Sequence, residues 1–539
     1  MKKSITLALV VVSVFTWNKN AQAQGQSVEK YLKGRFNGSY ESYSQYYLKN
    51  KIVTELPQDR LGSNNFLKLD YNYGKFSAGV QFEAYLPAVL GFYPFVLDPK
   101  GKIVNKYFKY TNDKFSVQVG DFYEQFGNGL ILRSYENRQI GINNAIEGAN
   151  VHVEPLPFVK LKALFGRTRR FFDYTNTLVR GTDVEFDINK MVKKEDSKVS
   201  ATFGGSYVGK YQSFSGGGST DDFPSTVHSY AARMSLNSGN FSLESEYVQK
   251  DRDPHLLNNQ SFDQGRAFQV DAAYTKNSFG ISATFRSLYN MDFTNDRDEE
   301  FATIAPVNFI PALTKQHDYL TSNIFVYAPQ FRGETGFQTD LFYTFKPGSV
   351  LGGKYGTKLS SNFSLYSGLN KQNDIFSLGR TRYFRDANIE MKKKLSKSFE
   401  LTVGLQHIFY NASVIQKPEL ALVDAYIAGV GGLYKWAPKK SVRFKAEHLY
   451  SKENEGSWVS MLSEFSFSSP FMFFVSDLYN YGTTNIHYYN IGSSYTKDSN
   501  RFSLSYGKQR PGLLCVGGIC RFVPASYGFT ATLTTTFSN

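Results

Sequence analysis

The chain has 539 residues and a formal net charge of +14 at pH 7, yet 16% of its residues are aromatic, with 47 Phe and 37 Tyr. Its basic residues are spread along the chain without a basic tract or a nucleic-acid motif, so we expect no nucleic-acid partner. Beyond the N-terminal segment, no run of about 20 apolar residues occurs that could form a membrane-spanning helix.

The N-terminal segment has the pattern of a secretory signal peptide. Lys2 and Lys3 precede the apolar run Ile5–Phe15, and Ala21-Gln22-Ala23 follows as a small-x-small cleavage site. We therefore predict a signal peptide over residues 1–23 and a single exported domain over residues 24–539.

Hairpins recur after this segment. The alternating stretches Phe66–Tyr73 and Phe76–Leu86 flank Gly74-Lys75, as two strands flank a tight turn. Short polar turns of the same kind are Asn112-Asp113-Lys114, Asn237–Asn240, Lys276-Asn277-Ser278, Leu395–Ser398 and Lys497–Asn500. Each turn is followed by an aromatic residue that opens the next strand: Phe115, Phe241, Phe279, Phe399 and, one residue later, Phe502.

Longer segments join the strands at their other ends. They are Pro87–Gly101, Glu124–Gly148, Arg167–Arg180, Lys210–Thr226, Lys250–Gly265, Met291–His317 and Gln416–Val423. Short turns alternating with long loops are typical of outer-membrane barrels. We predict an all-β, transmembrane antiparallel β-barrel of about 24 strands, with short periplasmic turns and long outer loops. Pairing the segment Tyr319–Tyr327 as a further hairpin gives the alternative of about 26 strands, and an antiparallel sandwich is the alternative fold.

The last stretch, Tyr527–Asn539, alternates throughout except at Thr535. Phe529, Leu533 and Phe537 fall on one face, and threonines occupy the other. Such a strand at the end of a soluble sheet leaves an unpaired edge, whereas pairing with the first strand closes a barrel. We expect lipids and the barrel assembly machinery as partners, and the outer membrane of a Gram-negative cell as the location.

Polar side chains occupy the faces that we expect to point inward. These are Ser242, Glu244 and Glu246; Lys160 and Lys162; Glu400, Thr402 and Gln406; and Arg443, Lys445 and Glu447. Their outward neighbours are mostly apolar, which inverts the pattern of a soluble barrel. A solvated surface with contacts to lipid head groups accounts for the positive charge, and a mildly anion-preferring pore is the alternative.

The segment Glu124–Gly148 mixes charged residues with glycines and apolar residues. Its charged residues include Glu124, Arg133, Glu136, Arg138 and Glu147. We expect this segment to fold into the lumen, where these five residues are candidates for a constriction. In the alternative, the charges pair with one another and simply hold the loop folded. A second candidate for an inward segment is the apolar stretch Asn308–His317.

Only two cysteines occur, Cys515 and Cys520, and four residues separate them. A disulfide in an exported chain is the prediction, with a structural role in the last outer loop. Free thiols and a metal site are the alternatives, although no further ligand lies close in sequence.

The histidines form no motif of a catalytic or metal site. They are His152, His228, His255, His317, His407, His448 and His487. We therefore predict no enzyme activity, no metal and no cofactor, with a hydrolase whose triad is dispersed in the sequence as the alternative.

Three stretches carry a resemblance to a known group of proteins. They are FYEQFGNGLILRSYE (Phe122–Glu136), LGGKYGTKL (Leu351–Leu359) and CVGGICRFVPASYGFT (Cys515–Thr530). With these stretches the mature chain resembles an uncharacterised Bacteroidota-type family of outer-membrane β-barrels. The resemblance implies a large barrel in the outer membrane and carries no activity.

Two functional hypotheses remain. The first is a porin-like channel or passive transporter for small solutes. The second is a structural or partner-binding barrel of a surface or secretion complex, with its lumen closed by loops.

Overall fold

The computed structural model describes residues 33–92, 100–213, 223–371, 373–468 and 470–539. The predicted signal peptide, residues 1–23, lies outside the described residues. Among the described residues, no helix is both long and apolar enough to cross a bilayer.

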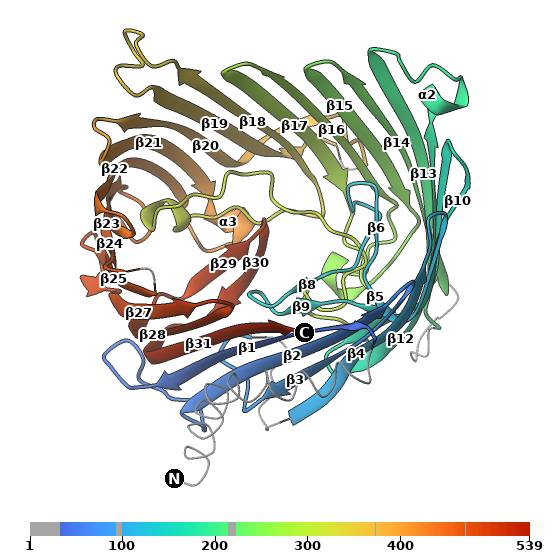
Figure 1. Ribbon diagram of the computed structural model, residues 1–539, viewed down its shortest axis with the longest axis horizontal. Coiled ribbons are helices and arrows are strands. Elements are labelled where there is room, and N and C mark those ends of the chain that lie inside the picture. The colour runs from blue at the N-terminus through green and yellow to red at the C-terminus, as the bar shows by residue number, and fades with distance from the viewer. Residues whose placement is uncertain (1–32, 93–99, 214–222, 372, 469) are drawn as a thin grey trace.

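The wall of the molecule is one antiparallel sheet that closes on itself as a barrel of 24 strands (Figure 1). Its strands are β1 (Arg35–Tyr47), β2 (Leu61–Tyr73), β3 (Phe76–Tyr85), β4 (Lys100–Thr111), β5 (Phe115–Phe122), β10 (Ile146–Leu156), β11 (Val159–Arg170), β12 (Asp173–Asp187), β13 (Val199–Tyr211), β14 (Thr226–Ser238), β15 (Phe241–Lys250), β16 (Gly265–Lys276), β17 (Phe279–Tyr289), β18 (Glu334–Phe345), β19 (Thr357–Leu369), β20 (Leu378–Lys394), β21 (Phe399–Asn411), β22 (Leu422–Ala437), β23 (Lys440–Tyr450), β24 (Trp458–Ser466), β25 (Phe471–Asn480), β27 (Asn490–Lys497), β28 (Asn500–Gln509) and β31 (Ser526–Ser538).

The other elements are short. They are β6 (Gln125–Phe126), β7 (Leu132–Arg133), β8 (Glu136–Asn137), β9 (Ile142–Asn143), β26 (Ile486–His487), β29 (Gly512–Val516), β30 (Ile519–Val523), α2 (Ile188–Met191), α3 (Ala412–Ile415), η2 (Leu256–Asn258) and η3 (Thr321–Asn323).

The last strand closes the barrel, as predicted. β31 pairs with β28 on one side and with β1 on the other, where Phe537 lies opposite Gly38 and Phe529 opposite Tyr46. The predicted number of about 24 strands is confirmed. Tyr319–Tyr327 adds no wall strand, because this segment forms η3 and a loop between β17 and β18.

The two ends of the barrel differ in their connections. The predicted polar turns join neighbouring strands at one end, the turn end, for example at Gly239-Asn240 between β14 and β15. Long connections lie at the opposite end, the loop end. The prediction of a long loop at Arg167–Arg180 is wrong, because β11 and β12 stay paired up to Arg170 and Asp173. Only Phe171-Phe172 joins these two strands, with Phe171 at a φ of 59°, and a register shift near Arg167 lets the pairing continue.

Aromatic side chains gather at the turn end, as expected. Phe115 contacts Tyr110 at 6.4 Å between ring centroids, and Phe279 contacts Tyr274 at the same distance. Such rings pack well across antiparallel strands and suit the boundary between apolar and aqueous surroundings.

The inward faces are polar along part of each strand and apolar at the loop end. Glu246 and Lys162 contact segments inside the lumen, as predicted. Closer to the loop end, inward positions are occupied by Val208, Val248 and Leu288, each fully buried. This apolar belt, which the sequence analysis missed, provides a packing surface inside the barrel.

The closure can be tested by truncation. Deleting Phe529–Asn539 leaves β1 and β28 each with an unpaired edge, and unpaired backbone groups cost several kcal/mol each in hydrocarbon. We expect no heat-modifiable folded barrel on SDS gels of membranes. The ring of Phe537 covers Gly38, so Phe537→Ala should lower the folded fraction, whereas the control Phe522→Ala, in the exposed part of β30, should not. Normal yield of folded protein from the truncation would contradict the role of β31.

Candidate functional site

Three chain segments fill part of the lumen. The first lumen loop is Tyr123–Ala145, with β6 to β9; the second lumen loop is Asn290–Gly333, with η3. The third is the disulfide hairpin, Gly512–Val523, formed by β29 and β30. All three lie inside the ring of wall strands in Figure 1.

The first lumen loop is held mainly by apolar contacts. Phe126, Leu130, Ile131 and Leu132 are at most 1% exposed and pack against the apolar belt of the wall. Burial of such a side chain stabilises by roughly 1.5–3 kcal/mol, whereas an exposed ion pair contributes about 0–1 kcal/mol. Apolar burial is therefore the larger contribution to holding this loop inside the barrel.

A wall carboxylate receives the tip of the first lumen loop. The backbone N–H of Asn128 donates to Oε2 of Glu246 on β15 at 2.7 Å. Gly127 has a φ of 51°, and a Cβ at this position would lie 2.7 Å from the same carboxylate. The left-handed φ and the close carboxylate together favour glycine at position 127.

Glu124 anchors the start of the first lumen loop to the wall. Its carboxylate accepts a bond from Nζ of Lys162 at 3.0 Å and lies 2.5 Å from Nε2 of His152. Nδ2 of Asn150 donates to it as well, at 3.0 Å. Burial opposes its ionisation, but the bond from His152 and the charge of Lys162 prevail and lower the pKa of Glu124 below 4.5.

The other charges of this loop have different partners. Arg138 pairs with Glu136 at 3.0 Å and with Glu41 of β1 at 3.1 Å, and Gln81 of β3 donates to Glu136. Arg133 has no acidic partner among the described residues; its guanidinium lies 3.9 Å from the ring centroid of Phe309. The loop charges thus pair mainly with the wall, and only Glu136 and Arg138 pair with each other.

Glu147 does not belong to the lumen. β10 begins at Ile146, and Ile146 and Asn150 both point inward, so by alternation Glu147 points to the outer face. There it pairs with Lys106 at 3.0 Å and Arg167 at 3.1 Å. Its selection as a constriction residue was wrong, because the start of a strand fixes which face each residue occupies and a shift of one residue reverses it.

The second lumen loop is tied to the wall at several points. The backbone N–H of Thr321 and the hydroxyl of Ser322 each donate to Glu447 of β23 at 2.8 Å. Nε2 of His317 lies 2.6 Å from Asp386 of β20. The predicted inward stretch Asn308–His317 thus lies in the lumen.

The two lumen loops form one body. The N–H of Arg133 donates to the carbonyl of Val307 at 2.9 Å, and the N–H of Phe309 donates to Gly129 at 2.9 Å. Nδ2 of Asn144 donates to the carbonyl of Pro306 at 2.7 Å. Moving either loop alone would break these backbone pairings.

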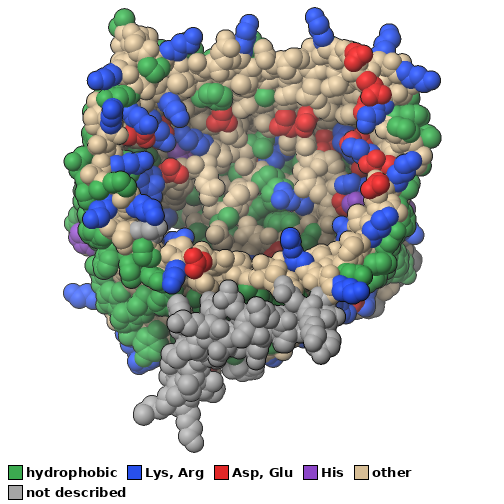
Figure 2. Space-filling view, in the orientation of Figure 1, with side chains coloured by type: hydrophobic (Ala, Val, Ile, Leu, Met, Phe, Trp, Pro, Cys, Tyr) green, Lys and Arg blue, Asp and Glu red, His purple; other side chains and the backbone are tan. Residues whose placement is uncertain are grey.

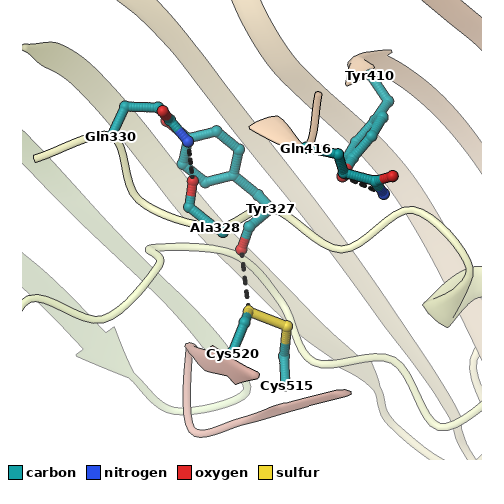
Figure 3. Close-up of a disulfide and its surroundings, with 7 residues drawn as sticks. All are labelled: Tyr327, Ala328, Gln330, Tyr410, Gln416, Cys515 and Cys520. Atoms are coloured by element: carbon teal, nitrogen blue, oxygen red, sulfur yellow. Dashed lines mark hydrogen bonds between the residues drawn. A yellow bond between two sulfur atoms is a disulfide. The ribbon is translucent and has the colours of Figure 1, made fainter. Parts of the chain in front are cut away.

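Cys515 and Cys520 form the predicted disulfide, and the hairpin packs onto the second lumen loop (Figure 3). Sγ of Cys520 lies 3.8 Å from the carbonyl oxygen of Tyr327. The N–H of Ala312 donates to the carbonyl of Gly518 at 2.9 Å. The bridge therefore shapes a hairpin that covers the inserted segment.

A polar cavity of about 290 Å³ remains between the second lumen loop and the wall. Its lining includes Lys315, His317, Tyr319, Asn388 and Gln406. Figure 2 shows the mouth of the barrel hollowed, with basic and acidic side chains around its rim and inner wall. The arrangement can accommodate a small hydrophilic molecule inside the barrel.

Among the described residues, no group of three or more His, Cys, Asp or Glu could hold a metal ion. Both ring nitrogens of His407 are engaged, by Arg385 and by Asp424, so neither is free to serve as a base.

The closed wall, the partly polar lumen and the inserted loops define a large β-barrel that resembles outer-membrane proteins. The chain belongs to a family of unknown function (DUF6029), whose sequence pattern matches residues 1–537. No curated protein matches it.

Among solved structures, the chain is similar to the translocation pore of the P pilus usher PapC, at 9% identity and a TM-score of 0.43, over 94% of this chain and 99% of that chain. It is also similar to the outer membrane protein OpdK of Pseudomonas aeruginosa, at 10% identity and a TM-score of 0.38, over 94% of this chain and 100% of that chain. Similarity at this level carries no argument about function.

Glu124→Gln should weaken the anchor of the first lumen loop. We expect a loss of roughly 1–2 kcal/mol in unfolding free energy, because Glu124 is buried while Lys162, at 34% side-chain exposure, is partly screened by solvent. Urea unfolding measures this loss. The control Glu300→Gln, an exposed acid of the second lumen loop, should change little.

The same anchor predicts a dependence on pH. Because the folded pKa of Glu124 lies below 4.5, its contribution is present at neutral pH and is lost as the pH falls below 4.5 through the lowered pKa. The difference between wild type and Glu124→Gln should therefore shrink in acid. A difference that grew in acid would contradict this role.

Replacing both Cys515 and Cys520 by Ser should be mild. A bridge across so short a loop removes only about 2 kcal/mol of unfolded-state chain entropy. The native protein should also resist maleimide until it is reduced. Full labelling without reductant, or loss of the folded barrel in the double variant, would contradict this prediction.

Proposed function

We propose that this protein is an outer-membrane channel that passes small hydrophilic solutes along its lumen, around the inserted loops. The observation that supports the proposal most is the polar cavity of about 290 Å³ between the second lumen loop and the wall. Its charged residues include Lys392, which pairs with Glu390 at 3.0 Å, and Lys315, whose Nζ donates to Oδ1 of Asn388 at 3.0 Å. A small hydrophilic solute would therefore meet hydrogen-bonding and charged groups in this cavity.

The outer face supports the membrane location within this proposal. Its exposed side chains include Val80, Phe165, Leu405 and Met461, which suit contact with lipid. The aromatic residues of the turn end suit the periplasmic interface, with the loop end facing outward. Lipids and the barrel assembly machinery are the expected partners. We expect no nucleic-acid partner, no cofactor and no enzyme activity.

Within a channel, Arg133 is the strongest candidate for setting ion preference. It has no acidic partner among the described residues and stacks on Phe309 where the two lumen loops meet. Glu124, Glu136 and Arg138 are bound to the wall, so they serve mainly to position the loop.

A structural or partner-binding barrel with a closed lumen is the second candidate. It is favoured by the extent to which both lumen loops are buried, since Ile131 and Tyr327 are fully inaccessible to solvent. Loops with such a core resemble a domain interior more than a mobile gate.

Single-channel recording separates the two candidates. In planar bilayers the purified protein should give conductance steps, and Arg133→Glu should shift the reversal potential toward cations, with a change of about twofold or more in permeability ratio. The control Lys354→Glu makes the same charge change at an exposed turn and should leave selectivity unaltered. A folded protein that never conducts would contradict the channel and favour the closed barrel.

A further inference from the structure

A second cavity lies between the two lumen loops and the disulfide hairpin. Its volume is about 230 Å³, and Ile519 and Cys520 of the hairpin form part of its lining. Most of the remaining lining is apolar or aromatic. The aromatic side chains are Tyr135, Phe293, Phe309 and Phe331.

One carboxylate lines this apolar cavity. Asp292 is 8% exposed, and within the described residues no hydrogen bond or ion pair reaches its carboxylate. Lys250 donates only to the main-chain oxygen of Asp292. A buried carboxylate without a direct partner is costly, so this position is a candidate for ligand binding.

The cations around Asp292 are engaged elsewhere. Lys210 pairs with Asp253 at 2.5 Å, and Lys250 lies 3.9 Å from the same carboxylate. The guanidinium of Arg332 donates to Asn259 at 2.8 Å. Asp253 thus balances the charge of both lysines, and the carboxylate of Asp292 faces the cavity.

The aromatic rings of the lining attract cations. Nζ of Lys210 and of Lys250 each lie 5.5 Å from the ring centroid of Phe293, and Arg133 stacks on Phe309. These contacts occupy Phe293 and Phe309, whereas the ring of Phe331 has no cation contact among the described residues and, beside a carboxylate, suits a bound ammonium group.

We propose that this cavity binds a small organic ammonium ion, a primary amine on an apolar or aromatic body, with its ammonium group on Asp292. The carboxylate supplies the charge-assisted hydrogen bond. Phe331 and Tyr135 supply apolar surface for the body of the ligand. This binding does not depend on whether the barrel conducts.

The dependence of amine binding on pH gives a second test of this site. Burial raises the pKa of Asp292 to about 7, although Lys250 and Arg332 lower it in part. The carboxylate is therefore charged at pH 8 and protonated at pH 5.5, so amine binding should weaken on acidification. The charged and titratable groups around it are Lys210, Lys250, Asp253, His255 and Arg332.

The test uses phenethylamine and its neutral analogue 2-phenylethanol, titrated calorimetrically into the folded, detergent-purified protein at pH 8. We expect the amine to bind about tenfold or more tightly than the alcohol. Asp292→Asn should abolish this preference, while the control Asp298→Asn, an exposed acid of the same loop, should retain it. Equal binding of amine and alcohol, or an unchanged preference in Asp292→Asn, would overturn the proposal.

A second variant tests the site independently, in case Asp292→Asn does not fold. Ala302 is exposed and lines the cavity, so Ala302→Phe should fill part of the space and weaken both probes. Unchanged amine binding by Ala302→Phe would place the amine elsewhere and overturn the assignment. Conductance recorded on the same samples keeps this outcome separate from that of the channel proposal.

Discussion

The structure depends on the closure of β31 against β1. Once these strands pair, every wall strand has two neighbours, and no edge is left to aggregate or to face hydrocarbon unpaired. Closure with so many strands also has a cost, because the interior is too wide for side chains alone to fill. In this barrel, segments of the chain itself occupy part of the interior.

The inserted segments are held by two kinds of interaction. Near the loop end an apolar belt packs against residues such as Leu130 and Ile310, giving a core inside the barrel. Ion pairs with buried carboxylates join these segments to wall residues far away in sequence, as between Glu124 and Lys162 at 3.0 Å. Removing one partner of such a pair leaves an uncompensated buried charge, so these pairs fix the arrangement more than they stabilise it.

The two cavities differ in the surfaces that enclose them. The polar cavity lies where the second lumen loop faces hydrophilic wall positions such as Asn388, and the apolar cavity lies where the two loops and the disulfide hairpin meet. Each takes its chemistry from the residues that line it. One lumen thus holds a cavity lined mostly by polar residues and a separate apolar cavity.

The sequence by itself determined the wall: alternation, polar turns and the final strand Phe529–Phe537 are local patterns with a period of two. The disulfide and the inward course of the first lumen loop were also predicted, because close cysteines and a mixed loop composition are local signals. Only the tertiary structure decided that Glu124 binds Lys162, that Glu147 faces outward and that Asp292 has no direct partner. These outcomes depend on strand register and on contacts between segments that lie far apart along the chain, and alternation alone carries no information about which distant segment fills the lumen.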